Sequence, residues 1–545
     1  MSSAPPQSFV EGFALAIARM PAGRAIDGAA GIAKSGIKDR HLLWIGLITP
    51  AVLLVHGYHP FAEDAGIYVA GVRKLLEPSL YGPDTLFVAA YTRFSLFAYL
   101  LAGIVRISRV PLVYVLFMGY LASICAYLLA CWTLARRIFT SNAAQWLAVA
   151  LAAACLTLPI AGTSLMLADP YLTSRSFSTP LGLFALVAAI EHRWMLTGVL
   201  LVVTGLVHPL MAIYVAAFVL LFVLVDAGWP RTGWLVSFLG VMVCGGIYLV
   251  CVHAPVSAAY RQAVLSRGYL FPSQWAWFED AGLVIPLLMY ALALPRLGTK
   301  TVPGKLCLAA LMLGVCCGSS AFLFVHRSGP YVLVRFQLLR GFQMVYLVGI
   351  ILLGGLIGDA LWKRRSRRWA ACAILAAVTV SMFFTQRFTY RLSRHIELPG
   401  MAPRNPWQQA FVWIRANTPP DAVFAANPEL VLVQGEDGQG FRVMTERSLL
   451  GDYKDEGVVV VFPELGERWA REFNAQVGMD SISDPDRLAR LRPLGATWVL
   501  LSNRAVTSLP CPYRNAVSQV CELTPGRLSA SPELAPGASD KASER

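Results

Sequence analysis

Two adjacent carboxylates, Glu63 and Asp64, end the segment 57–64 (GYHPFAED), which follows the first apolar run of the chain. An acidic pair at the end of a membrane helix has to be hydrated, paired with cations or used in catalysis, because unpaired charge is costly near lipid. A carboxylate can take a proton from a hydroxyl group, and it can help to hold a divalent cation through hard oxygen ligands. The pair is therefore the strongest functional signal in the sequence.

Further polar residues that could take part in the chemistry lie in other loops. Asp169 and Arg175 lie in the segment 167–180 (LADPYLTSRSFSTP), and His208 stands directly before Pro209. Arginine side chains can bind a phosphate group bidentately and stabilise negative charge on a leaving group. The remaining candidates for substrate binding are His59, Arg93, Arg335 and Arg340. An enzyme that transfers a group from a lipid phosphate donor would require such carboxylates opposite guanidinium groups.

These residues must be positioned by elements that lie in lipid. Hydrophobic residues make up 56% of the 545 positions, charged residues only 14%, and the mean hydropathy is +0.57, whereas soluble domains carry roughly a quarter charged residues. The composition thus predicts a polytopic α-helical membrane protein. Apolar runs able to cross a hydrocarbon core of about 30 Å predict about 11 transmembrane helices, at residues 42–56, 111–134, 143–161, 179–190, 194–207, 208–226, 233–253, 281–295, 305–325, 342–362 and 369–385.

The basic loops determine the expected orientation. Residues 94–107 form a further apolar run, which we interpret as an interfacial helix on the outer face. A crossing there would place the basic loops at 136–137 and 363–368 on opposite faces, against the positive-inside tendency. The N-terminal tail, residues 1–40, is then cytoplasmic, and the loops 57–110 and 161–178 and the C-terminus are periplasmic.

The net charge of +14 might suggest nucleic acid as a partner. Much of the positive charge lies in the loops that we expect on the cytoplasmic side, where it orients the spans and meets anionic lipid. No zinc-finger, helix-turn-helix or aromatic-plus-basic signature of nucleic-acid binding occurs. We therefore expect membrane lipid, and no nucleic acid, as a partner.

After about residue 386 the pattern changes to that of a small α/β domain, which we place at residues 386–528, after the transmembrane domain at 41–385. Helices are expected at 407–416, 463–477 and 485–491, and strands at 422–426, 441–445, 458–462 and 497–501. Residues 529–545, rich in Ser, Pro, Ala and Gly, predict a disordered tail. Cys511 and Cys521 could form a disulfide in an oxidising periplasm, but the sequence leaves their separation open.

Several of these segments carry a resemblance to a known family. The motifs are FAEDAGIYVAGVRKLL (61–76), LARRIF (134–139), DPYLTSRSFSTPLGLFAL (169–186), LVHPLMAIY (206–214) and FRVMTERSLLGDYK (441–454). With them the chain resembles bacterial GT-C integral membrane glycosyltransferases, which use polyprenyl-phosphate sugars, and most closely uncharacterised bacterial membrane proteins of that type. The resemblance covers most of residues 40–525 and implies a GT-C-like fold in the bacterial inner membrane.

The resemblance also implies roles for the acidic residues. One acid of the first-loop motif is catalytic in that family, which corresponds to Asp64 or Glu63, and Asp169 matches a second acid that assists or binds metal. Asp64 and Asp169 would then hold a divalent cation, Mg or Mn. The partners would be membrane lipid, a polyprenyl-phosphate-linked sugar and an envelope acceptor. The order Glu-Asp departs from the family's pattern and no WWD motif of oligosaccharyltransferases occurs, so transfer to asparagine is not favoured.

The acidic residues and His208 also have structural interpretations. Glu63 and Asp64 could cap a helix that begins near Ala65, because acids favour a helix N-terminus. Asp169 precedes a proline and could be a turn residue, and His208 could simply start a helix.

The same holds for the arginines and for the function as a whole. Arg175 could be an interfacial arginine, and Arg335 and Arg340 could bind lipid head groups. One alternative function is a transporter or flippase for a lipid-linked glycan, which would need charged residues at mid-membrane depth. Another is a catalytically inactive scaffold of the envelope.

Overall fold

The computed structural model describes residues 39–228, 256–329, 331–362, 365–433 and 435–523, together with the single residues 233, 240, 245 and 248. The chain separates into two compact units, Met1–Ile48 and Thr49–Arg545, and the candidate functional site lies in the second unit. Most of the expected tail at 1–40, nearly all of the expected span at 233–253 and the expected disordered tail at 529–545 lie outside the described residues.

The other segments expected to span the membrane all form helices. They are α3 (Asp39–His56), α7 (Leu112–Ile138), α8 (Asn142–Ala154), α9 (Ser174–Ile190), α10 (Trp194–Val207), α11 (Pro209–Asp226), α14 (Trp277–Leu297), α15 (Val302–Phe324), α16 (Phe342–Leu361) and α17 (Arg365–Thr389). Within the described residues, 6 segments are long and apolar enough to cross a membrane: Leu112–Ile138, Pro209–Asp226, Trp277–Leu297, Val302–Phe324, Leu333–Leu361 and Arg367–Thr389. The protein is thus a multi-pass membrane protein, and the number of 11 spans stays a prediction.

Helix α8 is shorter than expected, since it ends at Ala154 rather than near residue 161. Its 13 residues cover about 20 Å at 1.5 Å per residue, which is less than the hydrocarbon core. It packs closely on α16, where a Cβ atom added to Gly354 would stand 2.8 Å from the Cα of Ala148, and one added to Gly358 would stand 2.6 Å from the Cα of Ala144. Small residues four positions apart let helix backbones approach in this way.

The segment between α3 and α7, residues 57–111, folds into short helices. They are α4 (Asp64–Leu76), α5 (Thr85–Val88), the 3-10 turn η1 (Ala90–Arg93) and α6 (Phe97–Ser108). Helix α6 buries Phe97 and Leu101 on one face and exposes Leu100, Ile104 and Ile107 on the other. The expected helix at 94–107 is therefore present with apolar residues on its surface, and its position relative to a membrane stays a prediction.

The C-terminal part contains a small five-stranded sheet with the order β2-β1-β3-β5-β4. Strand β1 (Val423–Ala426) is parallel to β2 (Ser448–Leu449) and β3 (Trp498–Ser502), and β5 (Ser518–Glu522) is antiparallel to β3 and β4 (Tyr513–Arg514). Fully buried Phe424, Trp498 and Leu501 form the core beneath α18 (Pro406–Asn417). Two further helices are α21 (Gly466–Gln476) and α22 (Asp484–Leu491). Cys511 and Cys521 form a disulfide, which settles the question that the sequence left open.

Two of the expected strands are helices. Residues 441–445 form α19 (Phe441–Thr445), and residues 458–462 belong to α20 (Tyr453–Val461) apart from the last. Asp452 begins α20, because its carboxylate accepts the backbone N–H of Asp455 at 3.0 Å. The valines at 458–460 then pack with residues of α13 (Ala258–Leu265) and α21. Tertiary packing thus overrides the β preference of a valine run.

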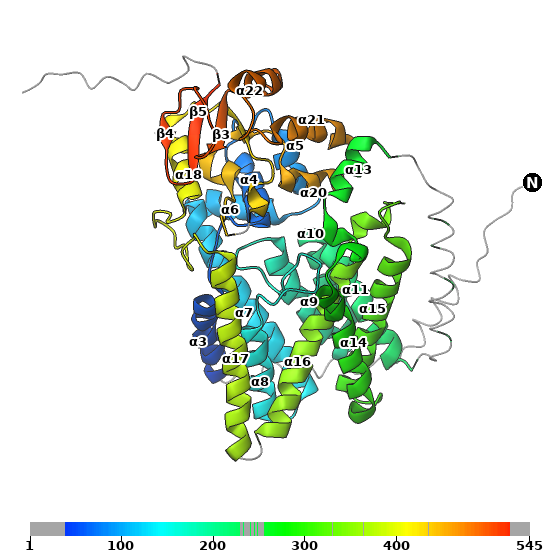
Figure 1. Cartoon of the computed structure of the whole chain (residues 1–545). Helices are drawn as coiled ribbons and strands as arrows, with labels where there is room; N and C mark the ends of the chain where they lie inside the picture. Colours follow the sequence, from blue (N-terminus) through cyan, green and yellow to red (C-terminus); the bar gives the residue numbers. More distant parts are fainter. Residues whose placement is uncertain are drawn as a thin grey trace, which may run out of the picture. The chain divides into compact units, whose positions relative to one another are not determined.

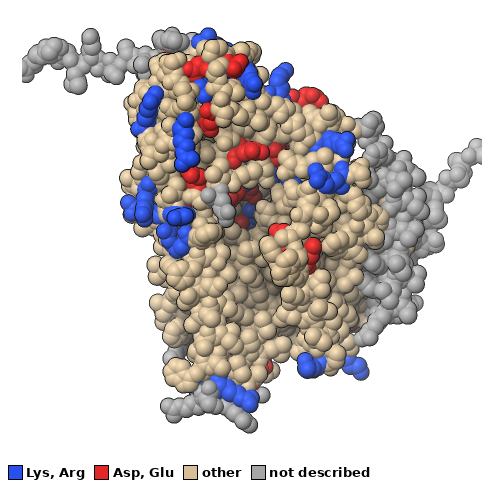
Figure 2. Space-filling model, viewed as in Figure 1, with Lys and Arg blue, Asp and Glu red and all other residues tan. Residues whose placement is uncertain are grey.

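Figure 1 shows α4 and α6 between the helical bundle of α7, α8, α16 and α17 and the C-terminal part that contains the sheet. Figure 2 shows few charged side chains on the lower half of the same face, where this bundle lies. Acidic and basic side chains gather above it around a hollow. The charged residues that could do chemistry therefore lie at one end of the bundle.

Candidate functional site

Asp64 is the first residue of α4, and two cations bind its two carboxylate oxygens. Arg175 Nη1 donates to Oδ2 at 2.9 Å, and Lys454 Nζ donates to Oδ1 at 3.3 Å. The same guanidinium binds Asp169, with Nη2 2.9 Å and Nε 3.1 Å from Oδ2. Arg175 therefore brings together Asp64 and Asp169, which are 105 positions apart in the sequence.

Arg175 is held by the first turn of α9. The Ser176 hydroxyl accepts the backbone N–H of Thr173 at 3.0 Å, which fixes the start of the helix, and the Thr173 hydroxyl donates to Asp169 at 3.3 Å. The side chains of Arg175 and Asp169 are only 6% and 5% exposed. Because a buried charge must be paired, each of these residues depends on the other, and the interpretation of Arg175 as an interfacial arginine does not describe its contacts.

Glu63 precedes α4 in a strained backbone conformation, with φ at 47°. Its side chain makes no capping hydrogen bond to the helix. Instead, one carboxylate oxygen accepts the Gln439 side-chain amide at 3.0 Å, and the other accepts Lys454 Nζ at 2.5 Å. A left-handed conformation of a non-glycine residue persists only when surrounding contacts enforce it, and such residues cluster at functional sites. Capping therefore does not account for Glu63.

The charges around Asp64 fix its ionisation. Burial raises the pKa of Asp64, but the positive charges of Lys454 and Arg175 outweigh this and hold the pKa well below its usual range. Burial lowers the pKa of Lys454, but Glu63 and Asp64 outweigh this and raise it above its usual value. Burial raises the pKa of Asp169, against the opposing charge of Arg175. Asp64 is thus a carboxylate and Lys454 an ammonium at neutral pH.

A cavity of about 310 Å³ lies beside Asp64. This is the size of small-molecule sites in proteins, roughly 300–1,000 Å³. Arg340 lines it, its Nε has no hydrogen-bond partner, and it takes part in no ion pair among the residues that the structure describes. Arg335 also lines it, and its Nε donates to the Tyr260 hydroxyl at 3.4 Å rather than to a carboxylate. The other polar lining residues are Tyr68, Tyr91, Arg175, His208, Arg267, Tyr269, Gln337 and Lys454.

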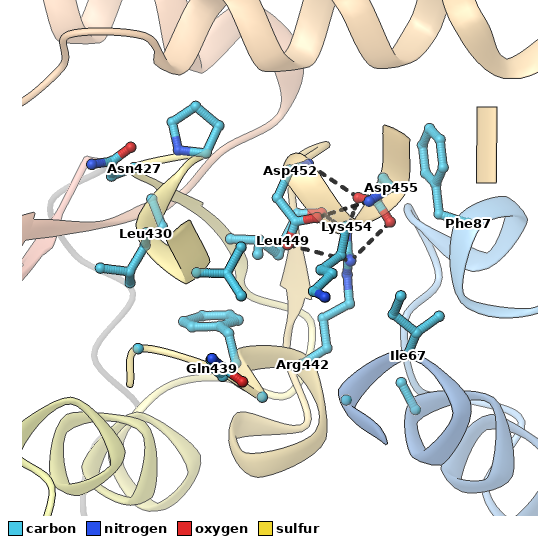
Figure 3. A pocket seen from close by; sticks show the side chains of 18 of the residues that line it. Ile67, Phe87, Asn427, Leu430, Gln439, Arg442, Leu449, Asp452, Lys454 and Asp455 are labelled. Carbon is cyan, nitrogen blue, oxygen red and sulfur yellow. Dashed lines mark hydrogen bonds and ion pairs between the residues drawn. The ribbon is translucent and has the colours of Figure 1, made fainter. Parts of the chain in front are cut away.

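A second, smaller pocket of about 70 Å³ lies on the Glu63 side of Lys454. Figure 3 shows Ile67 and Phe87, from the segment between α3 and α7, across the pocket from Asn427 and Leu430 of the C-terminal part, with Lys454 between them. Lys454 lines both pockets, so the acidic pair and its ammonium partner stand in the wall that separates them.

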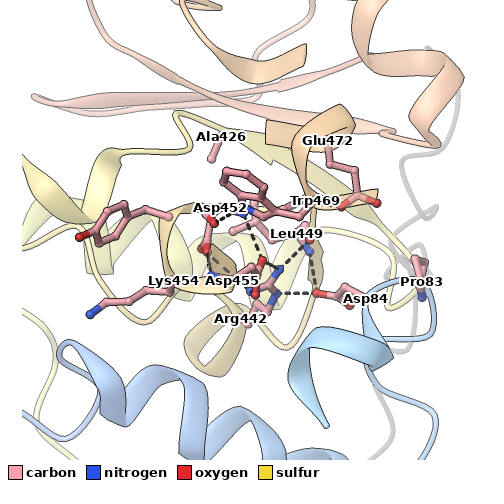
Figure 4. Close-up of polar contacts among 12 residues, drawn as sticks. Pro83, Asp84, Ala426, Arg442, Leu449, Asp452, Lys454, Asp455, Trp469 and Glu472 are labelled. Carbon is pink, nitrogen blue, oxygen red and sulfur yellow. Dashed lines mark hydrogen bonds and ion pairs between the residues drawn. The ribbon is translucent and has the colours of Figure 1, made fainter. Parts of the chain in front are cut away.

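A network around Arg442 fastens the segment between α3 and α7 to α20. Arg442 donates to Asp455 at 2.7 Å and 3.1 Å and to Asp84 at 2.5 Å. Asp84 also accepts the backbone N–H of Leu449 at 3.2 Å. Figure 4 shows these contacts with Lys454 extending from the same turn of α20 as Asp455. Because Asp455 is fixed, the backbone that carries Lys454 is fixed as well.

The other predicted site residues divide into two groups. His208 lines the cavity, and its Nδ1 accepts the backbone N–H of Met211 at 3.4 Å. In the neutral imidazole Nε2 then carries the proton. His59 does not line the cavity: it contacts Glu397 at 3.1 Å and stacks on Tyr390. Arg93 does not line it either, because its guanidinium lies over the ring of Phe462, 5.3 Å from the centroid.

Sequence reasoning missed Lys454 and Gln439 as site residues. Lys454 ends the motif FRVMTERSLLGDYK, but nothing in its type or spacing links it to the acidic pair. The only available signal was that this motif belongs to the segments that carry the family resemblance.

The acidic residues do not fit a resident divalent cation in this arrangement. The carboxylate oxygens of Asp64 and one oxygen of Asp169 already accept hydrogen bonds from Arg175 and Lys454. Across the described parts of the chain, no group of three or more His, Cys, Asp or Glu side chains could hold a metal ion.

A family model described as a domain of unknown function (DUF6798) matches residues 405–466. No curated protein matches the chain significantly. Among solved structures, the chain is similar to the oligosaccharyltransferase of Archaeoglobus fulgidus tethered to an acceptor peptide, with 12% identity, a TM-score of 0.48 and coverage of 85% of this chain and 68% of that chain. It is also similar to that protein in complex with Zn and sulfate, with 13% identity, a TM-score of 0.45 and coverage of 85% and 67%. A third similar structure is its complex with an inhibitory peptide and a dolichol-phosphate, with 13% identity, a TM-score of 0.43 and coverage of 85% and 69%.

Proposed function

We propose that this protein is a membrane glycosyltransferase that moves a sugar from a polyprenyl-phosphate donor to an acceptor of the cell envelope. The observation that carries the proposal is the composition of one cavity. Its wall holds an ionised carboxylate, Asp64, together with two arginines, Arg335 and Arg340, that have no carboxylate partner among the described residues. Such a cavity has a proton acceptor and free positive charge for a phosphate group.

The arginines bind the donor. Arg340 and Arg335 take the phosphate, because guanidinium groups donate bidentate hydrogen bonds to phosphate oxygens. Apolar side chains in the same wall, Leu210, Ile213 and Phe336, take the first carbons of the lipid. The neutral His208 donates through Nε2 to an oxygen of the donor. This arrangement keeps the charged head at the end of the bundle and the lipid against the apolar wall.

In the transfer step the acceptor hydroxyl oxygen forms a bond to the anomeric carbon of the sugar. The bond from that carbon to the phosphate oxygen breaks, and its electron pair leaves with the polyprenyl phosphate. The hydroxyl proton passes to Asp64 and from there to water. Arg340 and Arg335 stabilise the charge that develops on the leaving phosphate. The longer contact of Asp64, 3.3 Å to Lys454, is the one that an acceptor hydroxyl displaces.

We place this site on the periplasmic face of a bacterial inner membrane. The basic loops support this orientation through the positive-inside tendency, and the disulfide between Cys511 and Cys521 supports it because disulfides persist in oxidising compartments. A cysteine at the exposed position of Arg504 should react with a membrane-impermeant maleimide in intact cells. Labelling that appears only after lysis would contradict the orientation.

The decisive experiment replaces Asp64 by Asn, which keeps the shape and removes the charge. Purified protein is assayed with a panel of polyprenyl-phosphate sugars and envelope acceptors. Loss of a general base costs about 10²- to 10⁴-fold in rate, so Asp64→Asn should lower transfer by at least about 100-fold. The matched control is Glu77→Gln, an exposed acid of the same segment, which should leave transfer unchanged.

Three results would count against the proposal. Full activity of Asp64→Asn would remove the proposed base, and an equal loss in Glu77→Gln would show that the effect is not specific. A wild-type protein that transfers no sugar but moves lipid-linked glycan across proteoliposomes would favour the flippase.

A further inference from the structure

Lys454 occupies the place where a bridging cation would bind the acidic pair. Its Nζ lies 2.5 Å from Oε2 of Glu63 and 3.3 Å from Oδ1 of Asp64. Its side chain is 15% exposed, so it is held away from bulk water. A divalent cation shared by the same two oxygens would need the space that the ammonium fills.

The lysine is positioned, not loosely attracted. Asp452 caps the helix turn that carries it, and Arg442 holds Asp455 in the next position with two hydrogen bonds. On the other side, Arg267 Nη2 donates to the backbone carbonyl of Tyr453 at 2.6 Å. The backbone on both sides of Lys454 is therefore anchored by buried guanidinium groups.

The charges also disfavour a metal ion. Arg175 and Lys454 already contribute two positive charges to the cluster of Glu63, Asp64 and Asp169, and Arg340 lines the adjoining cavity. An added divalent cation would stand within a few ångströms of an ammonium and a guanidinium. Like charges at such distances repel strongly in a partly buried site.

From this geometry we propose that Lys454 is the built-in counter-cation of the acidic pair, so that the site works without a divalent metal ion. Lys454 acts as a positioning residue: it holds the Asp64 carboxylate in place and gives way to the acceptor hydroxyl. The inference rests on the proposed function only where transfer activity is measured. Whether a metal ion binds to Glu63 and Asp64 can be tested on protein that catalyses no reaction.

The binding test measures Mn²⁺ binding to the purified full-length protein by electron paramagnetic resonance. Wild type should bind no Mn²⁺ at the acidic pair, so its signal should equal that of Glu63→Gln. Lys454→Met removes the ammonium group from between the carboxylates of Glu63 and Asp64, so this variant should bind Mn²⁺ there. The double variant Lys454→Met/Glu63→Gln should lose this bound Mn²⁺. Lys454→Arg keeps the charge and should bind none, and it serves as the variant that preserves the fold. Lys74→Met should behave as wild type, because Lys74 donates to the backbone carbonyls of Pro78 and Leu80 and forms no ion pair among the described residues.

Two outcomes of the binding test would overturn the inference. One is Mn²⁺ bound to wild type and lost in Glu63→Gln. The other is a folded Lys454→Met protein that gains no Mn²⁺. In the activity test, EDTA should leave wild-type transfer unchanged, and transfer that EDTA abolishes and Mg²⁺ or Mn²⁺ restores would also overturn it. A wild type without any transferase activity would refute the proposed function and leave the binding test valid.

Discussion

Arg175→Met should destabilise the protein strongly, because Arg175 is the cation between two carboxylates. The substitution keeps the length and apolar stem of the side chain and removes its charge. Asp64 retains Lys454 as a partner, but Asp169 loses both of its contacts to the guanidinium and keeps only the Thr173 hydroxyl at 3.3 Å. Since the Asp169 side chain is 5% exposed, removing its partner should cost about 3–5 kcal/mol.

The cost can be assigned to Asp169 with a double-mutant cycle. The free energy of unfolding is measured by reversible unfolding in mixed micelles for wild type, Arg175→Met, Asp169→Asn and the double variant. Because Asp169→Asn removes the uncompensated charge, Arg175→Met should cost about 2 kcal/mol less in that background. The control is Arg137→Met, whose ion pair with Glu191 has a guanidinium that is 45% exposed and should contribute less than about 1 kcal/mol.

A loss of stability in Arg175→Met no larger than that in Arg137→Met would contradict this prediction. Strictly additive effects of Arg175→Met and Asp169→Asn would contradict it as well. Either result would mean that the guanidinium does not compensate a buried carboxylate.

Three further predictions concern the donor, the pH dependence and the C-terminal part. Arg340→Gln should raise the KM for a polyprenyl-phosphate sugar at least about 10-fold, because a charged hydrogen bond to phosphate is worth about 1.5–3 kcal/mol, and an unchanged KM would refute its role. Lys454 and Arg175 hold the pKa of Asp64 low, so wild-type transfer should persist below about pH 4. Lys454→Met should move this acid limb of the pH–rate profile to higher pH, and an unmoved limb would contradict the pairing. Replacing Cys511 and Cys521 by Ser removes a disulfide between residues 10 positions apart and should lower the free energy of unfolding by about 3 kcal/mol. The measurement is the urea concentration at the midpoint of unfolding, which should fall, and an unchanged midpoint would contradict the prediction.

A site residue can be predicted from the sequence when a local pattern marks it, but not when only the fold brings it to the site from a distant segment. Asp64, Asp169 and Arg175 are polar residues in short loops between apolar runs, so they can be expected at one face of a membrane protein. His59 and Arg93 share that pattern, yet they pack against Tyr390 and Phe462, because loop position alone does not say which way a side chain points. Lys454 could not be found at all, since only the folded C-terminal part brings it to Asp64.

The fold, too, is predictable from the sequence in one part and not in another. The apolar runs predict where helices lie, because a segment in lipid must form its backbone hydrogen bonds within itself. Residues 458–460, three valines in a row, predict a strand by composition. They form part of a helix because the Asp452 cap starts α20 and because Ala263 and Trp469 bury the valines. Such contacts between distant residues cannot be read from a local pattern.

The pairing of Lys454 with Glu63 has a consequence for how the protein is made. The two residues are 391 positions apart, and a ribosome that adds about 5–20 residues per second needs roughly 20–80 s to reach the second after the first. Arg175 is synthesised much earlier, so this guanidinium partner of Asp64 is available while most of the chain does not yet exist. A nascent chain, or one that ends early, can therefore insert its helices and still lack a complete site. The proposed activity should therefore appear only after the C-terminal part, which carries Lys454, has been translated and has folded.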